Sequence, residues 1–216
     1  MGKLQDLIAA LCPNGVEYKE LGDIAELCKG SGLQKKDFDE NGTVGCIHYG
    51  QIHTYFGSYT DHVIAHVSDK LAKKLMPVYP GDVIVAVTSE DVSACCKAVA
   101  WVGDETIVTG GHSVVIRHSL NPKFLAYCFL TDDFYRQKKR YAAGVKVVEM
   151  RTDRLARIKV PVPPREVQDE IVRLMDAYTQ KHDALVMQLR SEIEQEDMQL
   201  STFRETLLTF SERERE

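Results

Sequence analysis

The feature that most constrains this sequence is the 47-residue segment 164–210, which contains no glycine and no proline after its first residue. Proline is well tolerated in the first turn of an α-helix, where its missing N–H has no intrahelical partner. Nothing further along the segment interrupts a helix. The segment therefore predicts one α-helix of roughly 70 Å, at about 1.5 Å per residue.

Apolar side chains recur along this predicted helix at spacings of three and four residues, which places them on one face. The spacing departs from a strict heptad between Tyr178 and His182, so any supercoil is locally irregular. A single helix cannot bury such a stripe by itself, so we expect a partner helix to cover it. The alternative is that the helix folds back on the preceding residues. The stripe comprises Ile171, Leu174, Tyr178, Val186, Leu189, Ile193, Leu200, Phe203, Leu207 and Phe210.

Residues 1–163 are predicted to form a mixed α/β domain, followed by the helix at 164–210 and a charged tail at 211–216. Short β-branched runs bounded by turns predict strands at 82–87, 98–102, 106–109 and 113–116, with Gly110-Gly111 as a turn or bulge. Asn121-Pro122 then predicts a helix start. The apolar face of that helix would carry Phe124, Leu125, Tyr127, Cys128 and Leu130.

A proline-rich junction, residues 158–164, separates this domain from the long helix. Three prolines in four positions cannot lie inside a helix or a central strand. Because proline fixes φ and biases the preceding residue toward extended geometry, we expect a stiff connector that orients the helix after it.

Composition excludes several classes of protein. The hydrophobic fraction is 44% and the charged fraction 27%, which is ordinary for a folded domain. The longest apolar run, Phe124 to Leu130, is seven residues, whereas a membrane helix needs about 20. The start of the chain lacks the features of a secretory signal. We therefore expect a cytoplasmic protein without a membrane segment.

The six cysteines form no CxxC pair, so the sequence offers no zinc site and no other metal site. Nothing supports the secreted context in which three disulfides would form. We expect reduced, mostly buried thiols.

The net charge of −5 hides a segregation along the chain. Residues 134–159 have a net charge of +7, whereas the residues on either side are acidic. Such asymmetry is typical of a local anion-binding face.

Five segments of the chain resemble the specificity (S) subunits of type I restriction-modification systems. They are the opening at 11–23, the Pro80-Gly81-Asp82-Val83-Ile84 strand, the junction at 158–168, and the segments 171–176 and 204–210. The junction resembles the family signature I-P-x-P-P-x-x-x-Q, with Gln168 as its last residue. Val167 stands where the family often has Glu. Together the segments extend over nearly the whole chain.

The resemblance implies a subunit that selects a DNA sequence and carries no catalytic residue and no cofactor. Its expected partners are double-stranded DNA, methyltransferase (modification) subunits and a restriction subunit. Typical members have two recognition domains and two conserved helices, whereas this chain has one of each. It therefore resembles a half-subunit, either natural or truncated, and we expect a homodimer through the long helix.

Three segments are candidates for DNA contact. The basic stretch around residues 136–151 can neutralise phosphates. The Lys29-Gly30-Ser31-Gly32 segment reads as a flexible loop that leads to two lysines. The third segment is 49–55, where Gln51 could read an adenine edge bidentately. With two further loop positions, Ser89 and His112, the candidate residues are Lys35, Lys36, Tyr49, Gln51, His53, Ser89, His112, Arg136, Lys138, Lys139, Arg140, Lys146 and Arg151.

Two alternative functions remain open at this point. One is an interaction protein that docks on a modification or S subunit without reading DNA. The other is a cysteine hydrolase with Cys95 or Cys96 as nucleophile and His112 as base. The sequence contains no GxSxG, HExxH or Walker-type phosphate loop.

Overall fold

The computed structural model describes residues 2–144 and 147–208. The chain divides into two compact units, Met1–Ile171 and Val172–Glu216.

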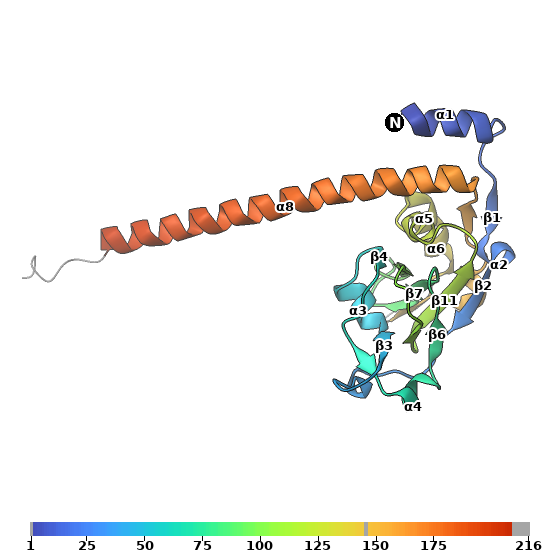
Figure 1. Ribbon diagram of the computed structural model, residues 1–216, viewed down its shortest axis with the longest axis horizontal. Coiled ribbons are helices and arrows are strands. Elements are labelled where there is room, and N and C mark those ends of the chain that lie inside the picture. The colour runs from blue at the N-terminus through green and yellow to red at the C-terminus, as the bar shows by residue number, and fades with distance from the viewer. Residues whose placement is uncertain (1, 145–146, 209–216) are drawn as a thin grey trace, which may run out of the picture. The chain divides into compact units, whose positions relative to one another are not determined.

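A five-stranded sheet forms the centre of the first unit (Figure 1). The three central strands are antiparallel, with Val85 opposite Val114 on one side and Ala98 on the other. All four residues of the middle strand are buried, as expected for a strand covered on both faces. In sheet order the strands are β2 (Ala25–Lys29), β11 (Ser113–His118), β7 (Val83–Ala86), β9 (Lys97–Trp101) and β4 (Tyr59–Thr60).

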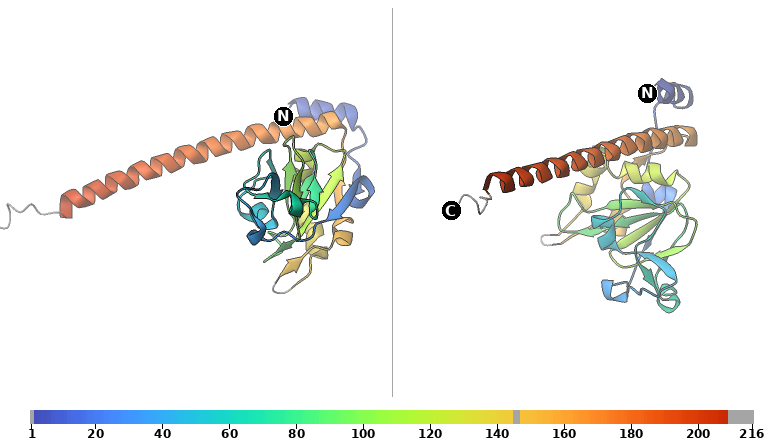
Figure 2. Two further views of the ribbon diagram at one scale, coloured as in Figure 1. Left: turned by 60° about the horizontal axis from the view of Figure 1, so that its bottom comes forward. Right: turned by 60° about the vertical axis from the view of Figure 1, so that its left-hand side comes forward.

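A four-stranded sheet completes the core. Most strands of this sheet and of the five-stranded sheet, coloured cyan to green, lie side by side in both views of Figure 2. Ile47 and Ile107 from this sheet pack in one cluster with Ile84 and Val99 of the five-stranded sheet. In sheet order its strands are β5 (His66–Val67), β3 (Val44–Ile47), β10 (Ile107–Thr109) and β6 (Met76–Val78). The strands predicted from β-branched runs are thus confirmed as β7, β9, β10 and β11.

Two strand pairs tie distant segments together. The proline-rich junction forms β13 (Lys159–Pro161), which pairs antiparallel with β1 (Tyr18–Glu20) near the start of the chain. With only one partner strand, this extended segment accommodates prolines that a central strand would not. The second pair joins β8 (Thr88–Ser89) to β12 (Val148–Glu149).

The helix predicted at Asn121 is confirmed as α5 (Pro122–Cys128), and the Asn121 side chain accepts hydrogen bonds from the backbone N–H groups of Lys123 and Phe124. One assignment was wrong: Leu130 lies beyond the helix end and is 63% exposed. The other short helices are α1 (Gly2–Leu11), α2 (Leu21–Ile24), η1 (Lys35–Asp37), α3 (Tyr49–Thr54), α4 (Asp69–Ala72), α6 (Asp132–Tyr141) and α7 (Thr152–Leu155).

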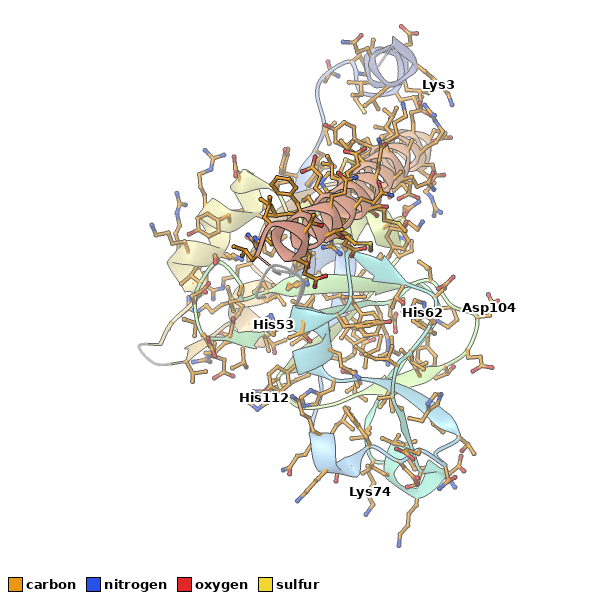
Figure 3. All side chains as sticks on the ribbon, turned by 90° about the vertical axis from the view of Figure 1, so that its left-hand side faces the viewer. Lys3, His53, His62, Lys74, Asp104 and His112 are labelled. Carbon is orange, nitrogen blue, oxygen red and sulfur yellow. The ribbon has the colours of Figure 1, made fainter. Side chains whose placement is uncertain are left out.

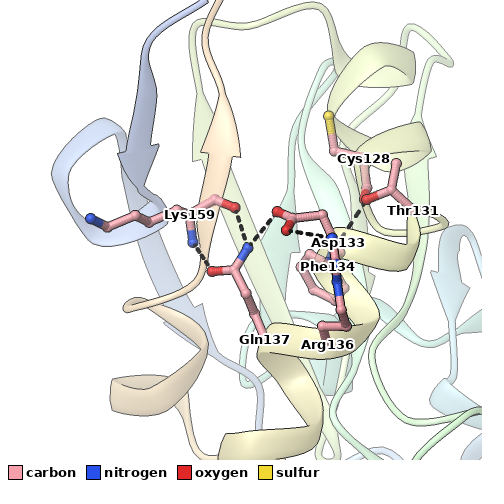
Figure 4. A network of polar contacts seen from close by, with 7 residues as sticks. All are labelled: Cys128, Thr131, Asp133, Phe134, Arg136, Gln137 and Lys159. Atoms are coloured by element: carbon pink, nitrogen blue, oxygen red, sulfur yellow. Dashed lines mark hydrogen bonds and ion pairs between the residues drawn. The ribbon is translucent and has the colours of Figure 1, made fainter.

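Polar side chains fix helix α6 to strand β13 (Figure 4). The Gln137 side chain accepts from the Lys159 backbone N–H at 2.8 Å and donates to the Lys159 carbonyl at 2.9 Å. Gln137 therefore occupies the edge of β13 as a neighbouring strand would. Thr131 caps α6 by accepting from the Phe134 N–H.

The long helix is confirmed as α8 (Arg165–Leu208). Gln168, the last residue of the junction signature, is buried; its Oε1 accepts from the Asn121 N–H at 2.7 Å and its Nε2 donates to the Pro163 carbonyl at 2.8 Å. The signature glutamine thus joins the first turn of α8 to the start of α5.

In the second unit the described residues, 172–208, are the rest of α8, and most of their apolar stripe is exposed. Tyr178, Leu189, Ile193, Leu200, Phe203 and Leu207 are each 45–75% exposed. Val186 is half-buried, as are Ile171 and Leu174 near the start of the helix, and Phe210 lies outside the described residues. Coiled-coil pairing through the stripe remains a proposal.

All six cysteines are free, and only Cys28 is not buried. The expectation of reduced, mostly buried thiols is thus confirmed. No helix among the described residues is long and apolar enough to cross a membrane.

His118, on β11, makes the stability of the domain depend on pH. Burial lowers the pKa of the imidazole to about 4, an effect that the Leu120 backbone offsets only in part. The unfolded chain therefore binds a proton near pH 6.5 that the folded chain does not bind until about pH 4. The contribution of neutral His118 to the free energy of unfolding is fully present above about pH 6.5 and is lost as the pH falls toward 4.

We expect the free energy of unfolding to decrease by about 2 kcal/mol between pH 7.5 and pH 5 because of this one group. His118→Phe should remove that part of the pH dependence in urea unfolding. An unchanged dependence in the variant would contradict the assignment.

Candidate nucleic-acid interface

Side chains from three separate segments converge on one face of the first unit. The Tyr49 ring lies 4.9 Å from the His112 ring and 6.4 Å from the His53 ring, measured between centroids. Thr88 joins both histidines, since its hydroxyl is 3.0 Å from His112 Nδ1 and its carbonyl 3.0 Å from His53 Nε2. We call these four residues the histidine face. Figure 3 shows His53 and His112 close together, away from His62 and Asp104.

Two cavities flank Tyr49. One of about 450 Å³ is lined by residues that include His53, Ser89, Glu90 and Lys97. The other, of about 460 Å³, is lined by residues that include Lys35, His48 and His112. The structure therefore brings together five of the candidate residues: Lys35, Tyr49, His53, Ser89 and His112.

The local fold of α3 explains why Tyr49 and His53 lie on the same face, being four residues apart on one helix. His48 caps this helix, with its Nδ1 accepting from the Gly50 N–H at 3.1 Å. Burial, Lys35 and His112 all lower the pKa of His48, which keeps its imidazole neutral and able to accept.

The Gln51 side chain takes part in the same helix cap. Its Oε1 accepts from the His48 N–H at 2.8 Å, completing a capping box. A bidentate contact with adenine needs both the oxygen and the nitrogen of the amide. The amide oxygen has a second lone pair, so one backbone donor does not exclude this contact, and the bidentate role of Gln51 stays a prediction.

Backbone strain is concentrated around this face. Among the described residues that are not glycine, only Leu33, Cys96 and His112 have positive φ, at 55°, 63° and 64°. The left-handed region is unfavourable for residues with a Cβ. Leu33 and His112 line the cavity beside Lys35, and Cys96 ends the loop that follows β8. Strained residues of this kind gather at functional sites.

The Lys29–Gly32 segment is not a flexible loop as predicted. The Gly30 N–H donates to the Ser113 carbonyl at 2.9 Å, and the Gly111 N–H donates to the Gly32 carbonyl at 2.8 Å. The two glycine-rich segments are thus joined backbone to backbone, which fixes Lys35 and His112 relative to each other. Lys36 is exposed on η1.

The basic stretch around residues 136–151 contains several exposed cationic side chains and one buried cationic side chain. Arg136, Lys139 and Arg140 are exposed on α6, and Arg151 is exposed in an ion pair with Asp153 at 3.0 Å. Lys146 lies outside the described residues. The prediction that Lys138 contacts phosphate was wrong: it is 5% exposed, and its Nζ donates to the Ser93 and Cys95 carbonyls.

Sequence reasoning missed Thr88 and Lys97. Thr88 directly follows the β-branched run at 82–87 and precedes Ser89, so its position after a predicted strand was the available signal. Lys97 begins β9 and donates to the His53 carbonyl at 3.3 Å, a contact that no local pattern reveals.

The arrangement does not resemble a thiol hydrolase. Cys95 and Cys96 are buried, with the Cys95 Sγ donating to the Val87 carbonyl at 3.4 Å and lying 3.9 Å from the Cys96 Sγ. His112 contacts Thr88 and Tyr49 instead. In the described part of the chain, no group of three or more His, Cys, Asp or Glu side chains is arranged to hold a metal ion.

The family model described as "Type I restriction modification DNA specificity domain" matches residues 13–195. No curated protein matches the sequence significantly.

Three solved structures share the fold. The S subunit of a type I restriction-modification system from M. genitalium is 14% identical with a TM-score of 0.52, covering 80% of this chain and 42% of that one. The HsdS subunit from Thermoanaerobacter tengcongensis is 18% identical with a TM-score of 0.54, covering 85% and 44%. A chain from a study of assembly and conformational transition of the type I R-M system is 18% identical with a TM-score of 0.64, covering 94% and 52%.

This chain therefore spans about half the length of the solved chains that it resembles. The family match extends over most of the sequence, from the start of the α/β domain into the long helix. The chain belongs to the type I restriction modification DNA specificity domain family, whose members select DNA and are not themselves catalytic.

Proposed function

We propose that the chain reads one part of a bipartite DNA target and directs methyltransferase and restriction subunits to it. The observation that carries this proposal is the convergence of Lys35, Tyr49, His53, Ser89 and His112 around two cavities. The domain boundaries that we propose are 1–163 for recognition of DNA and 164–210 for the helix.

The chemistry of the histidine face suits base edges better than phosphates alone. Imidazole, phenol and hydroxyl groups both donate and accept hydrogen bonds, as the donor and acceptor pattern in the major groove requires. The cations of α6 and Lys35 would supply phosphate contacts, which orient a protein on the duplex without reading its sequence.

The long helix would set the distance between two recognition domains. Its 44 residues correspond to about 66 Å, or roughly two turns of DNA. Two copies paired antiparallel through the exposed stripe would place their recognition domains at opposite ends. Two-fold symmetry of such a homodimer makes the expected target an interrupted palindrome.

Selection from a randomised duplex library tests this function. The chain, assembled with its modification subunits, is expected to enrich one motif at about 150 mM salt, and His112→Ala should reduce the enrichment. A complex that forms but enriches no motif would favour the alternative, an interaction protein that does not read DNA.

The double variant Lys139→Ala/Arg140→Ala is expected to weaken binding to all duplexes alike. Each lost phosphate contact should reduce the slope of log K against log salt by about 0.9. Fluorescence anisotropy between 50 and 200 mM salt measures this slope. Lys74→Ala is the matched control, because Lys74 is exposed and lies at an end of the domain away from His53 (Figure 3). A slope unchanged in the double variant would exclude α6 from the phosphate contacts.

A further inference from the structure

Lys138 differs from the other cations of α6. It is buried, whereas Arg136, Lys139 and Arg140 are exposed. Its Nζ lies 2.8 Å from the Ser93 carbonyl oxygen and 2.6 Å from the Cys95 carbonyl oxygen, and 5.5 Å from the centroid of the Tyr135 ring. The ammonium group thus contacts the loop after β8 and is turned away from solvent.

Burial of this cation is costly in itself. Removal from water lowers the pKa of Lys138, while Cys96, Cys95 and Asp91 act in the opposite direction. An apolar side chain of similar length would fill the same space without this cost. The ammonium group adds directed hydrogen bonds: the Cys95 carbonyl, which is buried, and the Ser93 carbonyl both accept from it.

Strand β8 pairs with β12 at the start of this loop, whereas the turn from Asp91 to Ala94 is built from local contacts. Asp91 Oδ1 accepts from the Ser93 hydroxyl at 2.6 Å and from the Ala94 N–H at 2.8 Å. Cys96 ends the loop in the left-handed region, with its N–H donating to the Ala86 carbonyl. Lys138, 43 residues from Cys95 in the chain, is the contact that ties this local turn to α6.

The outer part of the same loop lines the cavity beside the histidine face. Ser89, Glu90, Asp91 and Ala94 all contribute to its wall, opposite Tyr49 and His53. Asp91 is engaged within the turn, so Ser89 and the exposed Glu90 are the side chains available to base edges. A carboxylate there can accept from the amino group of cytosine.

We propose that Lys138 is a positioning residue for sequence recognition: it fixes the 88–96 loop against α6 so that Ser89 and Glu90 meet base edges, without itself contacting DNA. The proposal rests on the proposed function. It predicts that the two carbonyl contacts of Lys138 affect which sequence is bound and do not affect how strongly binding depends on salt.

The test compares Lys138→Met with Lys139→Met in the full chain assembled with its modification subunits. Affinities for the selected motif and for random duplex are measured from 50 to 200 mM salt, well below the melting temperature. For Lys138→Met we expect the ratio of the two affinities to fall at least about tenfold, with an unchanged salt slope on random duplex. For Lys139→Met we expect the slope to fall by about 0.9 with an unchanged ratio.

Amide hydrogen exchange supplies an independent readout, since residues 88–96 should exchange faster in Lys138→Met and not in Lys139→Met. If Lys138→Met does not fold, Lys138→Arg takes its place, because it keeps the charge but cannot reproduce the same contacts. A reduced salt slope, or an unchanged affinity ratio in a folded variant, would overturn the proposal. A wild-type chain with no sequence preference would overturn the proposed function as well, so the two failures are distinguishable.

Discussion

Leu189→Asp combined with Ile193→Asp is expected to convert the chain from a dimer to a monomer. Both side chains lie on the exposed stripe of α8, at 48% and 58% exposure. Burying each in a helix pair contributes about 1.5 kcal/mol, and two-fold symmetry counts each side chain twice. The loss is then about 6 kcal/mol, or roughly four orders of magnitude in Kd, before the cost of burying carboxylates.

Light scattering coupled to size exclusion measures the outcome directly. The double variant should have the mass of one chain, 24.4 kDa, whereas the wild type should have twice that mass. Ser191→Asp combined with Gln195→Asp is the matched control, because these positions lie on the opposite side of the same helical turns and add the same charge. If the Leu189 and Ile193 variant remains dimeric, the proposed helix pairing is wrong.

Gly110→Ala is expected to destabilise the domain by about 3 kcal/mol, which lowers the melting temperature by about 9 °C. A Cβ at this position would lie 2.2 Å from the Leu33 Cβ and 2.7 Å from the Gly32 carbonyl oxygen. Neither neighbour can move easily, because backbone hydrogen bonds join the Gly30–Gly32 and Gly110–Gly111 segments. The shift should also separate Lys35 from His112 and so weaken sequence-selective binding.

Thermal unfolding followed by circular dichroism tests this prediction. Gly57→Ala is the control, because a Cβ there would meet no atom within 4 Å. Similar melting temperatures for the two variants would show that the two glycine segments are not held together as the structure describes.

Periodicity and turn residues were sufficient to predict much of the fold. The helix from 164 onward followed from the absence of glycine and proline, and the strand at 82–87 from its β-branched run. Both signals are local, so tertiary contacts reinforce them rather than decide them. Leu130 was misplaced because α5 ends at Cys128, two residues earlier than an apolar pattern alone suggests.

The site was harder to predict because the hydrogen bonds that a side chain makes depend on residues far apart in the chain. The Gln51 side chain accepts a hydrogen bond within its own helix cap. The Lys138 ammonium group donates to two carbonyls more than 40 residues away in the chain. Residue type indicates a polar or charged group but not whether that group is already bonded. The convergence of His53, Thr88 and His112 likewise arises only when the sheet assembles.

Methylation mapping shows whether the chain reads DNA as a symmetric pair. The chain is expressed together with its modification subunit, and methylated sites in the host DNA are mapped. We expect one methylated motif that is an interrupted palindrome, with a spacer fitting two recognition domains about two DNA turns apart. An asymmetric motif would contradict the homodimer, and a stable complex that methylates no defined motif would contradict the claim that this chain reads DNA.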